Sequence, residues 1–196
     1  MKHEQLKWMF AESPQGSGDK EMPDLWASPS SRLHKVQVKE FERFVTGTTD
    51  ASQLMEAAAL EINLWVSLYK VVQNKGAPGV DGQSVETVLA HSKELLPRLR
   101  RQLLEGSYRP GDIRRVWIPK PGGGERGLGI PNVIDRWVQQ AVLQVLEPIF
   151  EPTFHDSSHG FRRGRGAQTA IAQARKHLAS GHTTIVDIDL AKFFDR

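Results

Sequence analysis

The segment 183–190 (TTIVDIDL) constrains the fold most, because its β-branched start favours a pleated strand. Successive side chains of a strand point to opposite faces, so Asp187 and Asp189 share one face, and Ile188 and Leu190 share the other. Two neighbouring carboxylates repel each other unless a cation lies near them, which favours a site for a hard metal ion. Alternatively, one or both carboxylates are solvated or cap the next helix, and these residues alone leave both interpretations open.

Positive charge is concentrated in one part of the chain. The whole sequence has 26 Lys and Arg against 23 Asp and Glu, a net charge of +3. Between residues 98 and 126, eight basic residues face only three acidic ones. The basic residues are Arg98, Arg100, Arg101, Arg109, Arg114, Arg115, Lys120 and Arg126. This clustering favours contact with phosphates, although many basic stretches are only solvated faces.

Two absences narrow the class of protein. The chain has no cysteine, so it forms neither disulfides nor thiolate metal sites, as is usual in a reducing compartment. No apolar run approaches the length of a membrane span, and the polar start does not resemble a secretory signal. We therefore expect a cytoplasmic protein without a membrane segment.

The first 49 residues are polar and rich in Ser, Pro and Gly, which predicts a flexible extension over residues 1–49. A helix is expected from Asp50 or Ser52 to about Val72, with one apolar stripe. The stripe consists of Leu54, Ala58, Ile62, Trp65 and Leu68. A glycine-rich loop follows at residues 74–82, and then a helix over residues 85–104 that breaks or bends near Pro97.

Residues 113–131 predict a β-hairpin. The runs 113–119 (IRRVWIP) and 127–131 (GLGIP) flank a glycine-rich turn, KPGGGER. Lys120 and Arg126 stand on either side of that turn, so a closing tip could clamp an anion between an ammonium and a guanidinium. The alternative is a pair of solvated cations on an exposed turn.

Two more helices are expected in the last third of the chain. One begins at Asn132 or Asp135 and ends at Phe150, and the other spans residues 167–179. The first has an apolar face that we expect in the core, formed by Val138, Val142, Val145, Leu146 and Ile149. Between the helices, residues 159–166 (HGFRRGRG) combine three arginines with three glycines, which allows close backbone approach to a polyanion.

Taken in order, these segments resemble the reverse transcriptases and maturases encoded by bacterial group II introns. The resemblance covers residues 74–196 and rests on four motifs that occur in the order of that family. They are NKGAPGVDG, IPKPGGGERGLGIPNVIDRWVQQAV, SHGFRRGRGAQTAI and VDIDLAKFFDR. The resemblance implies an α+β fold, the right-hand polymerase architecture, with fingers at residues 50–182 and the first strand of a truncated palm at residues 183–196.

The resemblance also implies roles for residues of the catalytic centre. Asp189 corresponds to the first catalytic carboxylate, a ligand of two Mg²⁺ ions, and the carbonyl of Leu190 to a further ligand. Phe194 corresponds to the aromatic residue that lies under the incoming sugar and excludes a 2′-hydroxyl. Lys120 and Arg126 correspond to the pair that holds the nucleotide triphosphate. No role follows for Asp187.

Further arginines are implied in contacts with nucleic acid. Arg162 and Arg165 match the family's GFRxGR element, and Arg114 and Arg115 lie in the basic hairpin strand. The implied activity is RNA-directed DNA polymerisation together with assistance to intron splicing. The implied partners are an RNA template, intron RNA, a DNA primer and deoxynucleoside triphosphates.

The chain departs from the family pattern at two positions and at its end. Gly127 and Arg163 replace prolines of the usual RPLGIP and GFRPGR, which is expected to loosen the backbone near the arginines. The second pair of catalytic aspartates does not follow Asp189, so we expect this fragment to be inactive alone. Three alternatives remain. The chain could be a non-catalytic RNA-binding module, a truncated gene remnant, or part of a defence- or CRISPR-associated reverse transcriptase.

Overall fold

The computed structural model describes residues 51–190, with side chains from residue 53 onward. These residues divide between Phe150 and Glu151 into two compact units, and each is described by itself. The predicted domain boundaries at residues 49/50 and 182/183 stay predictions. The predicted flexible extension and Phe194 lie outside the described residues.

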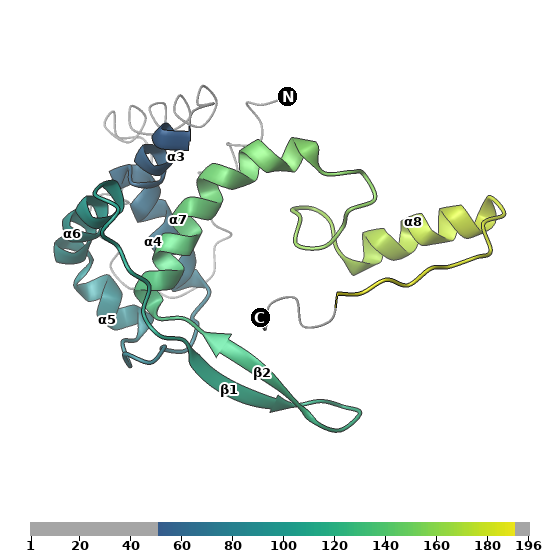
Figure 1. Cartoon of the computed structure of the whole chain (residues 1–196), viewed down its shortest axis with the longest axis horizontal. Helices are drawn as coiled ribbons and strands as arrows, with labels where there is room; N and C mark the ends of the chain where they lie inside the picture. Colours follow the sequence, from purple (N-terminus) through teal and green to yellow (C-terminus); the bar gives the residue numbers. More distant parts are fainter. Residues whose placement is uncertain (1–50, 191–196) are drawn as a thin grey trace, which may run out of the picture. The chain divides into compact units, whose positions relative to one another are not determined.

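The first unit is built from helices and one hairpin (Figure 1). Its elements are α3 (Ala51–Ala58), α4 (Glu61–Gln73), α5 (Val85–Ala90), α6 (Ser92–Leu104), β1 (Arg114–Pro119), β2 (Glu125–Ile130) and α7 (Val133–Phe150). The second unit has a short 3₁₀ turn, η1 (Glu151–Thr153), and α8 (Ala167–Ala179). The mixture of helices with a small antiparallel sheet agrees with the predicted α+β class.

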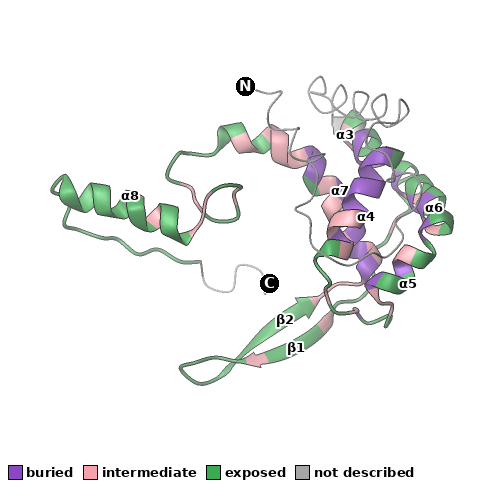
Figure 2. Ribbon diagram, turned by 180° about the vertical axis from the view of Figure 1, so that it is seen from behind, coloured by how far each residue is buried: buried purple, intermediate pink, exposed green. Residues whose placement is uncertain are grey.

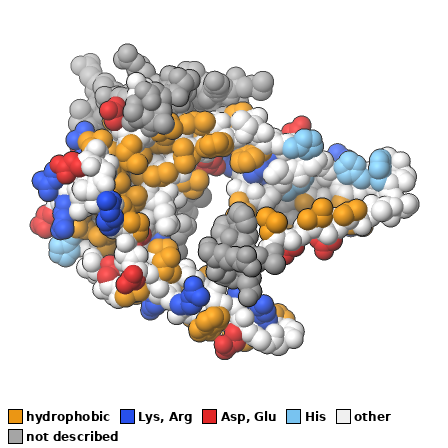
Figure 3. Space-filling model, in the orientation of Figure 1, with side chains coloured by type: hydrophobic (Ala, Val, Ile, Leu, Met, Phe, Trp, Pro, Cys, Tyr) orange, Lys and Arg blue, Asp and Glu red, His pale blue; other side chains and the backbone are white. Residues whose placement is uncertain are grey.

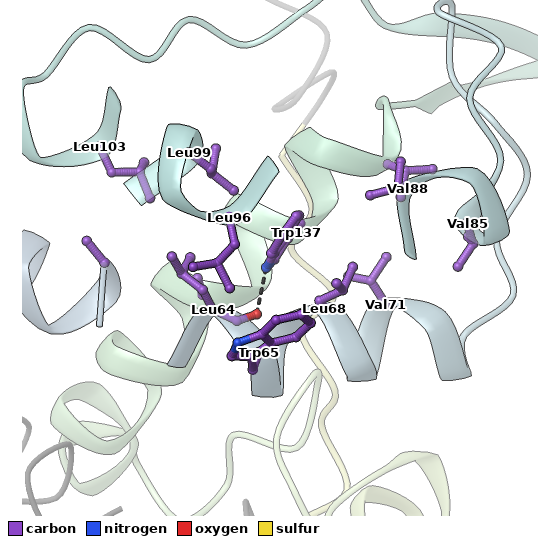
Figure 4. Close-up of a cluster of buried hydrophobic side chains, with 13 residues drawn as sticks. Leu64, Trp65, Leu68, Val71, Val85, Val88, Leu96, Leu99, Leu103 and Trp137 are labelled. Atoms are coloured by element: carbon purple, nitrogen blue, oxygen red, sulfur yellow. Dashed lines mark hydrogen bonds between the residues drawn. The ribbon is translucent and has the colours of Figure 1, made fainter. Parts of the chain in front are cut away.

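The core of the first unit lies where α4 and α7 pack together with α5 and α6 (Figures 2 and 4). Leu64 and Trp137 are fully buried at its centre, and the indole Nε1 of Trp137 donates a hydrogen bond to the carbonyl of Leu64 (2.6 Å). This bond satisfies the one polar atom of a large buried ring. The hairpin extends from this helical core, so the core fixes the base of the hairpin.

The single helix expected up to Val72 is two helices. Leu60 has an extended backbone (φ −58°, ψ 136°) and separates α3 from α4. The side-chain amide of Asn63 donates to the carbonyl of Ala58 (2.9 Å) at the end of α3 and so satisfies a group that the break leaves free. The apolar stripe continues through the break, because Ala58, Ile62 and Trp65 are all buried.

The second predicted helix is also divided, but at His91 and not near Pro97. Ser84 caps α5 by accepting a hydrogen bond from the amide of Thr87 (3.2 Å), and the helix ends at His91. Pro97 lies inside α6 on an exposed face, where solvent can hydrate the carbonyl that a proline leaves without a partner. The break therefore lies at His91, and the helix continues through Pro97.

The helices predicted to end at Phe150 and to span residues 167–179 are both present, as α7 and α8. The buried face of α7 coincides with the predicted one only at Val145. Its fully buried apolar residues are Val133, Trp137, Ala141 and Val145, whereas Val138, Val142, Leu146 and Ile149 are only half-buried. The predicted face is rotated because α4 packs against the row that contains Trp137.

The expected strand over residues 183–190 is not formed. The segment runs back along α8 as a coil and all of its residues are exposed (Figure 1). A strand requires a hydrogen-bonded neighbour, and within residues 51–190 only β1 and β2 pair. None of the helices described there is both long enough and apolar enough to cross a membrane.

Candidate functional site

The hairpin register fixes which side chains share a face. Residue pairs across the ladder run from Arg114 with Ile130 to Pro119 with Glu125. Alternation then defines two faces. The Lys120 face carries Arg114, Val116, Ile118, Lys120, Arg126, Leu128 and Ile130. The Trp117 face carries Ile113, Arg115, Trp117, Pro119, Glu125, Gly127 and Gly129.

The structure brings Lys120 and Arg126 to one face of the hairpin near its tip. The amide of Lys120 donates to the carbonyl of Gly124 (2.9 Å), which extends the ladder by one step, and Arg126 pairs with Ile118 two residues away. Both cations are exposed, and neither has a hydrogen-bond or ion-pair partner among the described residues. They are therefore free to share one anionic group.

The two neighbouring arginines of β1 point to opposite faces. Arg114 is half-buried on the Lys120 face, and its Nε is buried with no hydrogen-bond partner in the described part of the chain. Arg115 is exposed on the Trp117 face. The basic strand predicted as one RNA contact thus presents cations in two directions.

A helix residue without an expected role connects α7 to the loop 74–82. Arg136 of α7 donates through Nη2 to the carbonyl of Ala77 (2.7 Å). A Cβ on Gly76 would lie 2.0 Å from Nη1 of Arg136, so a side chain at position 76 would displace the guanidinium from this position. No sequence pattern identified Arg136, because a single arginine in the first turns of an amphipathic helix looks like a solvated residue.

A second group without an expected role consists of Tyr108, Gly111 and Asp135, close in sequence to the two ends of the hairpin. Tyr108 donates its hydroxyl to Oδ1 of Asp135, and the amide of Gly111 donates to both oxygens of this buried carboxylate (3.3 and 3.2 Å). Burial, and then the hydrogen bond to Asp135, raise the pKa of Tyr108 well above its usual range. From the sequence, Asp135 was predicted only as a helix cap.

In the second unit, Arg162 is held inside its own loop. Its Nε and Nη2 donate to Oε1 of Glu151 (3.0 and 2.7 Å), and Nη2 also reaches the carbonyl of Glu151 (3.5 Å). Its Nη1 donates to the carbonyls of His155 (2.9 Å) and Ser158 (3.0 Å). These contacts use all five donors of a guanidinium, and only 8% of the side chain is exposed. Arg162 therefore organises this loop, and its contact with RNA stays a prediction.

Arg165 also bonds within the loop. It donates to the carbonyl of Asp156 and forms an ion pair with the carboxylate of the same residue (3.3 Å). The Asp156 side chain is almost fully exposed, so this pair is weaker than that of Arg162. Arg165 has 27% of its side chain exposed and keeps some capacity for an external contact.

Asp189 is exposed, and its Oδ1 accepts a hydrogen bond from the amide of Leu190 (2.8 Å). Within residues 51–190, no three acidic, histidine or cysteine side chains gather into a group that could hold a metal ion. A Mg²⁺ site needs near-octahedral oxygen coordination, which one or two exposed carboxylates do not provide. The described residues alone therefore do not fit a complete magnesium site.

Comparisons with known proteins relate the chain to reverse transcriptases and intron-encoded proteins. Residues 118–196 match the family model described as reverse transcriptase (RNA-dependent DNA polymerase). The chain is 38% identical over 178 residues to Protein YkfC of Escherichia coli K12, covering 87% of this chain and 42% of that protein. It is 35% identical over 132 residues to group II intron-encoded protein LtrA of Lactococcus lactis subsp. cremoris, covering 67% and 22%. It is also 39% identical over 65 residues to nuclear intron maturase 1, mitochondrial, of Arabidopsis thaliana, covering 33% and 9%.

Proposed function

The chain belongs to the family of group II intron-encoded reverse transcriptases and maturases, and from this premise we propose that it serves RNA-directed DNA synthesis and intron splicing. The chain spans less than half the length of the relatives described above. Reverse transcription and splicing assistance, which would be activities of a whole protein, are therefore proposed for this chain. The proposed partners are an RNA template, intron RNA, a DNA primer and deoxynucleoside triphosphates, held by polymerase fingers of the right-hand type.

The Lys120 face of the hairpin carries this proposal. Lys120 and Arg126 are both exposed there, share one face and have no partner among the described residues. An ammonium and a guanidinium side by side at a glycine-rich tip suit a triphosphate, whose oxygens accept from both groups. Arg114 lies on the same face, and its unpaired Nε supports a role beside the nucleotide or template.

For the second unit the proposal is limited to single residues. Asp189 would contribute one carboxylate and Leu190 its carbonyl to Mg²⁺, and Phe194 would contact the sugar of the nucleotide. Magnesium supplies charge neutralisation at the phosphates when it is bound. Residues 51–190 alone do not complete a site for the ion.

The test is a chimera in which this chain is followed by the part of LtrA that lies beyond the matched region. We expect it to extend a DNA primer on an RNA template in the presence of Mg²⁺. Asp189→Asn should lower the rate about 100-fold or more, because one metal ligand is lost. Arg126→Ala should raise KM for the nucleotide about 10- to 100-fold, the equivalent of one or two charge-assisted hydrogen bonds.

A matched control is Leu143→Ala on α7, which removes an exposed apolar side chain with no assigned role. Its rate should stay within about twofold of the unaltered chimera, as is usual for surface positions. Primer extension that persists after Asp189→Asn would contradict the assignment of the carboxylate. A folded chimera that shows no extension would contradict the proposed activity of the chain.

A further inference from the structure

The Trp117 face of the hairpin has an unusual surface for a two-stranded sheet. Trp117 is 57% exposed and Ile113 is 59% exposed, yet both side chains lie down across the opposite strand. A Cβ on Gly127 would be 3.2 Å from Cζ3 of Trp117, and one on Gly129 would be 2.9 Å from Cγ2 of Ile113. The two glycines therefore make room for a flat apolar surface that solvent covers on its outer side.

This arrangement explains one departure from the family pattern. Gly127 stands where the family usually has proline, and a proline would bring its ring against the indole of Trp117. From the sequence, Gly127 was expected only to loosen the backbone. In the structure Gly127 pairs with Trp117 across the ladder and allows the indole to lie flat.

Arg115 gives the same face a positive charge. It lies between Ile113 and Trp117 by alternation, is exposed, and has no hydrogen-bond or ion-pair partner among the described residues. The acidic residue of this face, Glu125, pairs with Pro119 at the tip end of the ladder, away from the register position of Arg115. On the side of the molecule seen in Figure 3, basic and hydrophobic side chains lie along the hairpin together with acidic ones.

We propose that the Trp117 face binds single-stranded RNA, with a base stacked on the indole of Trp117 and the adjoining phosphate bound by Arg115. An exposed aromatic ring beside a free guanidinium is the combination that holds unpaired bases on sheet surfaces. One indole and one isoleucine expose far less area than the roughly 1,200 Å² that a stable protein interface buries. This favours a nucleotide over a protein as the occupant.

The proposed RNA site is distinct from the triphosphate contact, because Lys120 and Arg126 point to the opposite face of the ladder. It rests on the proposed function only for the presence of RNA as a partner. The hairpin would then contact nucleic acid on both faces. A strand that passes the Trp117 face would not compete with a nucleotide at the tip.

The test measures binding of a fluorescein-labelled oligouridylate of about 12 nucleotides, a length within the usual range of single-strand sites, by fluorescence anisotropy. Trp117→Ala should weaken binding by the complete 196-residue chain about 5- to 100-fold, and Trp117→Phe by less than about threefold, because a phenyl ring still stacks. Arg115→Ala should weaken binding and lower the salt dependence by about one ion. Leu143→Ala is the matched control for loss of an exposed apolar side chain.

A second measurement locates the base. Irradiation of the complex formed with a 5-bromouridine-substituted oligonucleotide should crosslink the peptide that contains Trp117. If Trp117→Ala binds within twofold of the parent chain, or if the crosslink lies outside the hairpin, the proposal is wrong. It is equally wrong if sedimentation shows that Trp117→Ala separates a dimer and leaves RNA binding unchanged, because the occupant is then a second copy.

The two proposals fail separately. A chimera that does not extend a primer, combined with RNA binding that depends on Trp117, would contradict the proposed polymerase function and leave the RNA site in place. An active chimera whose RNA affinity ignores Trp117 would contradict only the RNA site. A parent chain that does not bind the oligouridylate at low salt would overturn the RNA site directly.

Discussion

Whether an arginine can contact a ligand depends on how many of its donors the protein itself uses. Arg162 directs all five N–H groups to Glu151, His155 and Ser158, whereas Arg115 and Arg126 have no partner among the described residues. The sequence shows all three simply as arginines in basic segments. The groups that accept hydrogen bonds from an arginine lie elsewhere in the chain. The motifs therefore could not show which arginines are already bonded and which are free.

The pair of Tyr108 and Asp135 leads to a prediction about stability. The carboxylate is only 6% exposed and accepts from the Tyr108 hydroxyl and the Gly111 amide. Tyr108→Phe removes one hydrogen bond to a buried charge, so the free energy of unfolding at pH 7 should fall by about 2 kcal/mol. Urea denaturation followed by circular dichroism measures this difference.

The same pair predicts the pH dependence. Burial and the hydrogen bond to Asp135 raise the pKa of Tyr108 in the folded chain, whereas the unfolded phenol ionises near its usual value of about 10. The contribution of Tyr108 is therefore complete below about pH 10 and is lost as the pH rises further. The phenylalanine variant lacks this loss, so the stability gap between the two proteins should narrow above pH 10. A gap that widens there would contradict the assignment.

At the level of elements, the positions of helix breaks follow from side-chain contacts with distant segments. The apolar periodicity runs through the break between α3 and α4, but Asn63 joins three segments there. Its amide donates to the carbonyls of Ala58 (2.9 Å) and Ala141 (3.0 Å), and its Oδ1 accepts from Nε2 of Gln144 (2.6 Å). Asn63 and Gln144 are both almost completely buried. Such a network cannot be found from the spacing of apolar residues.

Asn63→Leu should lower the free energy of unfolding by about 3 kcal/mol, because it removes the side-chain donor to the buried carbonyls of Ala58 and Ala141. It also leaves the Gln144 amide with only the longer bond to the main-chain carbonyl of residue 63 (3.3 Å). The control is Asn63→Leu combined with Gln144→Met. The double variant should be less destabilised than the sum of the two single variants, since both polar partners are then removed together. Strict additivity in thermal or urea unfolding would show that the two side chains do not act as a pair.

At the scale of the whole molecule, the sequence predicted the elements better than their assembly. The hairpin, α7 and α8 were located within one or two residues, because turn glycines and apolar spacing are local signals. The strand predicted at residues 183–190 is not formed in the structure, because a strand needs a neighbouring strand to pair with. The strand register determines which residues share the Lys120 face. The space that Gly127 leaves for the Trp117 ring depends on side-chain positions, which the sequence does not show.

The two units differ in how they bury apolar side chains. The first unit has a continuous core, whereas no residue between 151 and 190 is fully buried (Figure 2). In the segment 183–190, Ile185, Val186 and Ile188 are 81%, 75% and 83% exposed. A run of exposed β-branched residues in an extended segment is a template for intermolecular strand pairing. Self-association of this chain should therefore begin in its second unit.

Replacing Val186 and Ile188 with lysine tests this conclusion. The two residues are two positions apart, so in an extended chain both side chains point to the same side. The double variant should remain monomeric at about tenfold higher concentration, since like charges oppose strand pairing. Its thermal unfolding midpoint should equal that of the parent, because the core around Trp137 is untouched. The control Leu143→Lys changes an isolated exposed residue of α7 and should leave the onset of association unchanged, as measured by light scattering. If both variants delay association equally, net charge is the cause, and the segment 183–190 is not the site of contact.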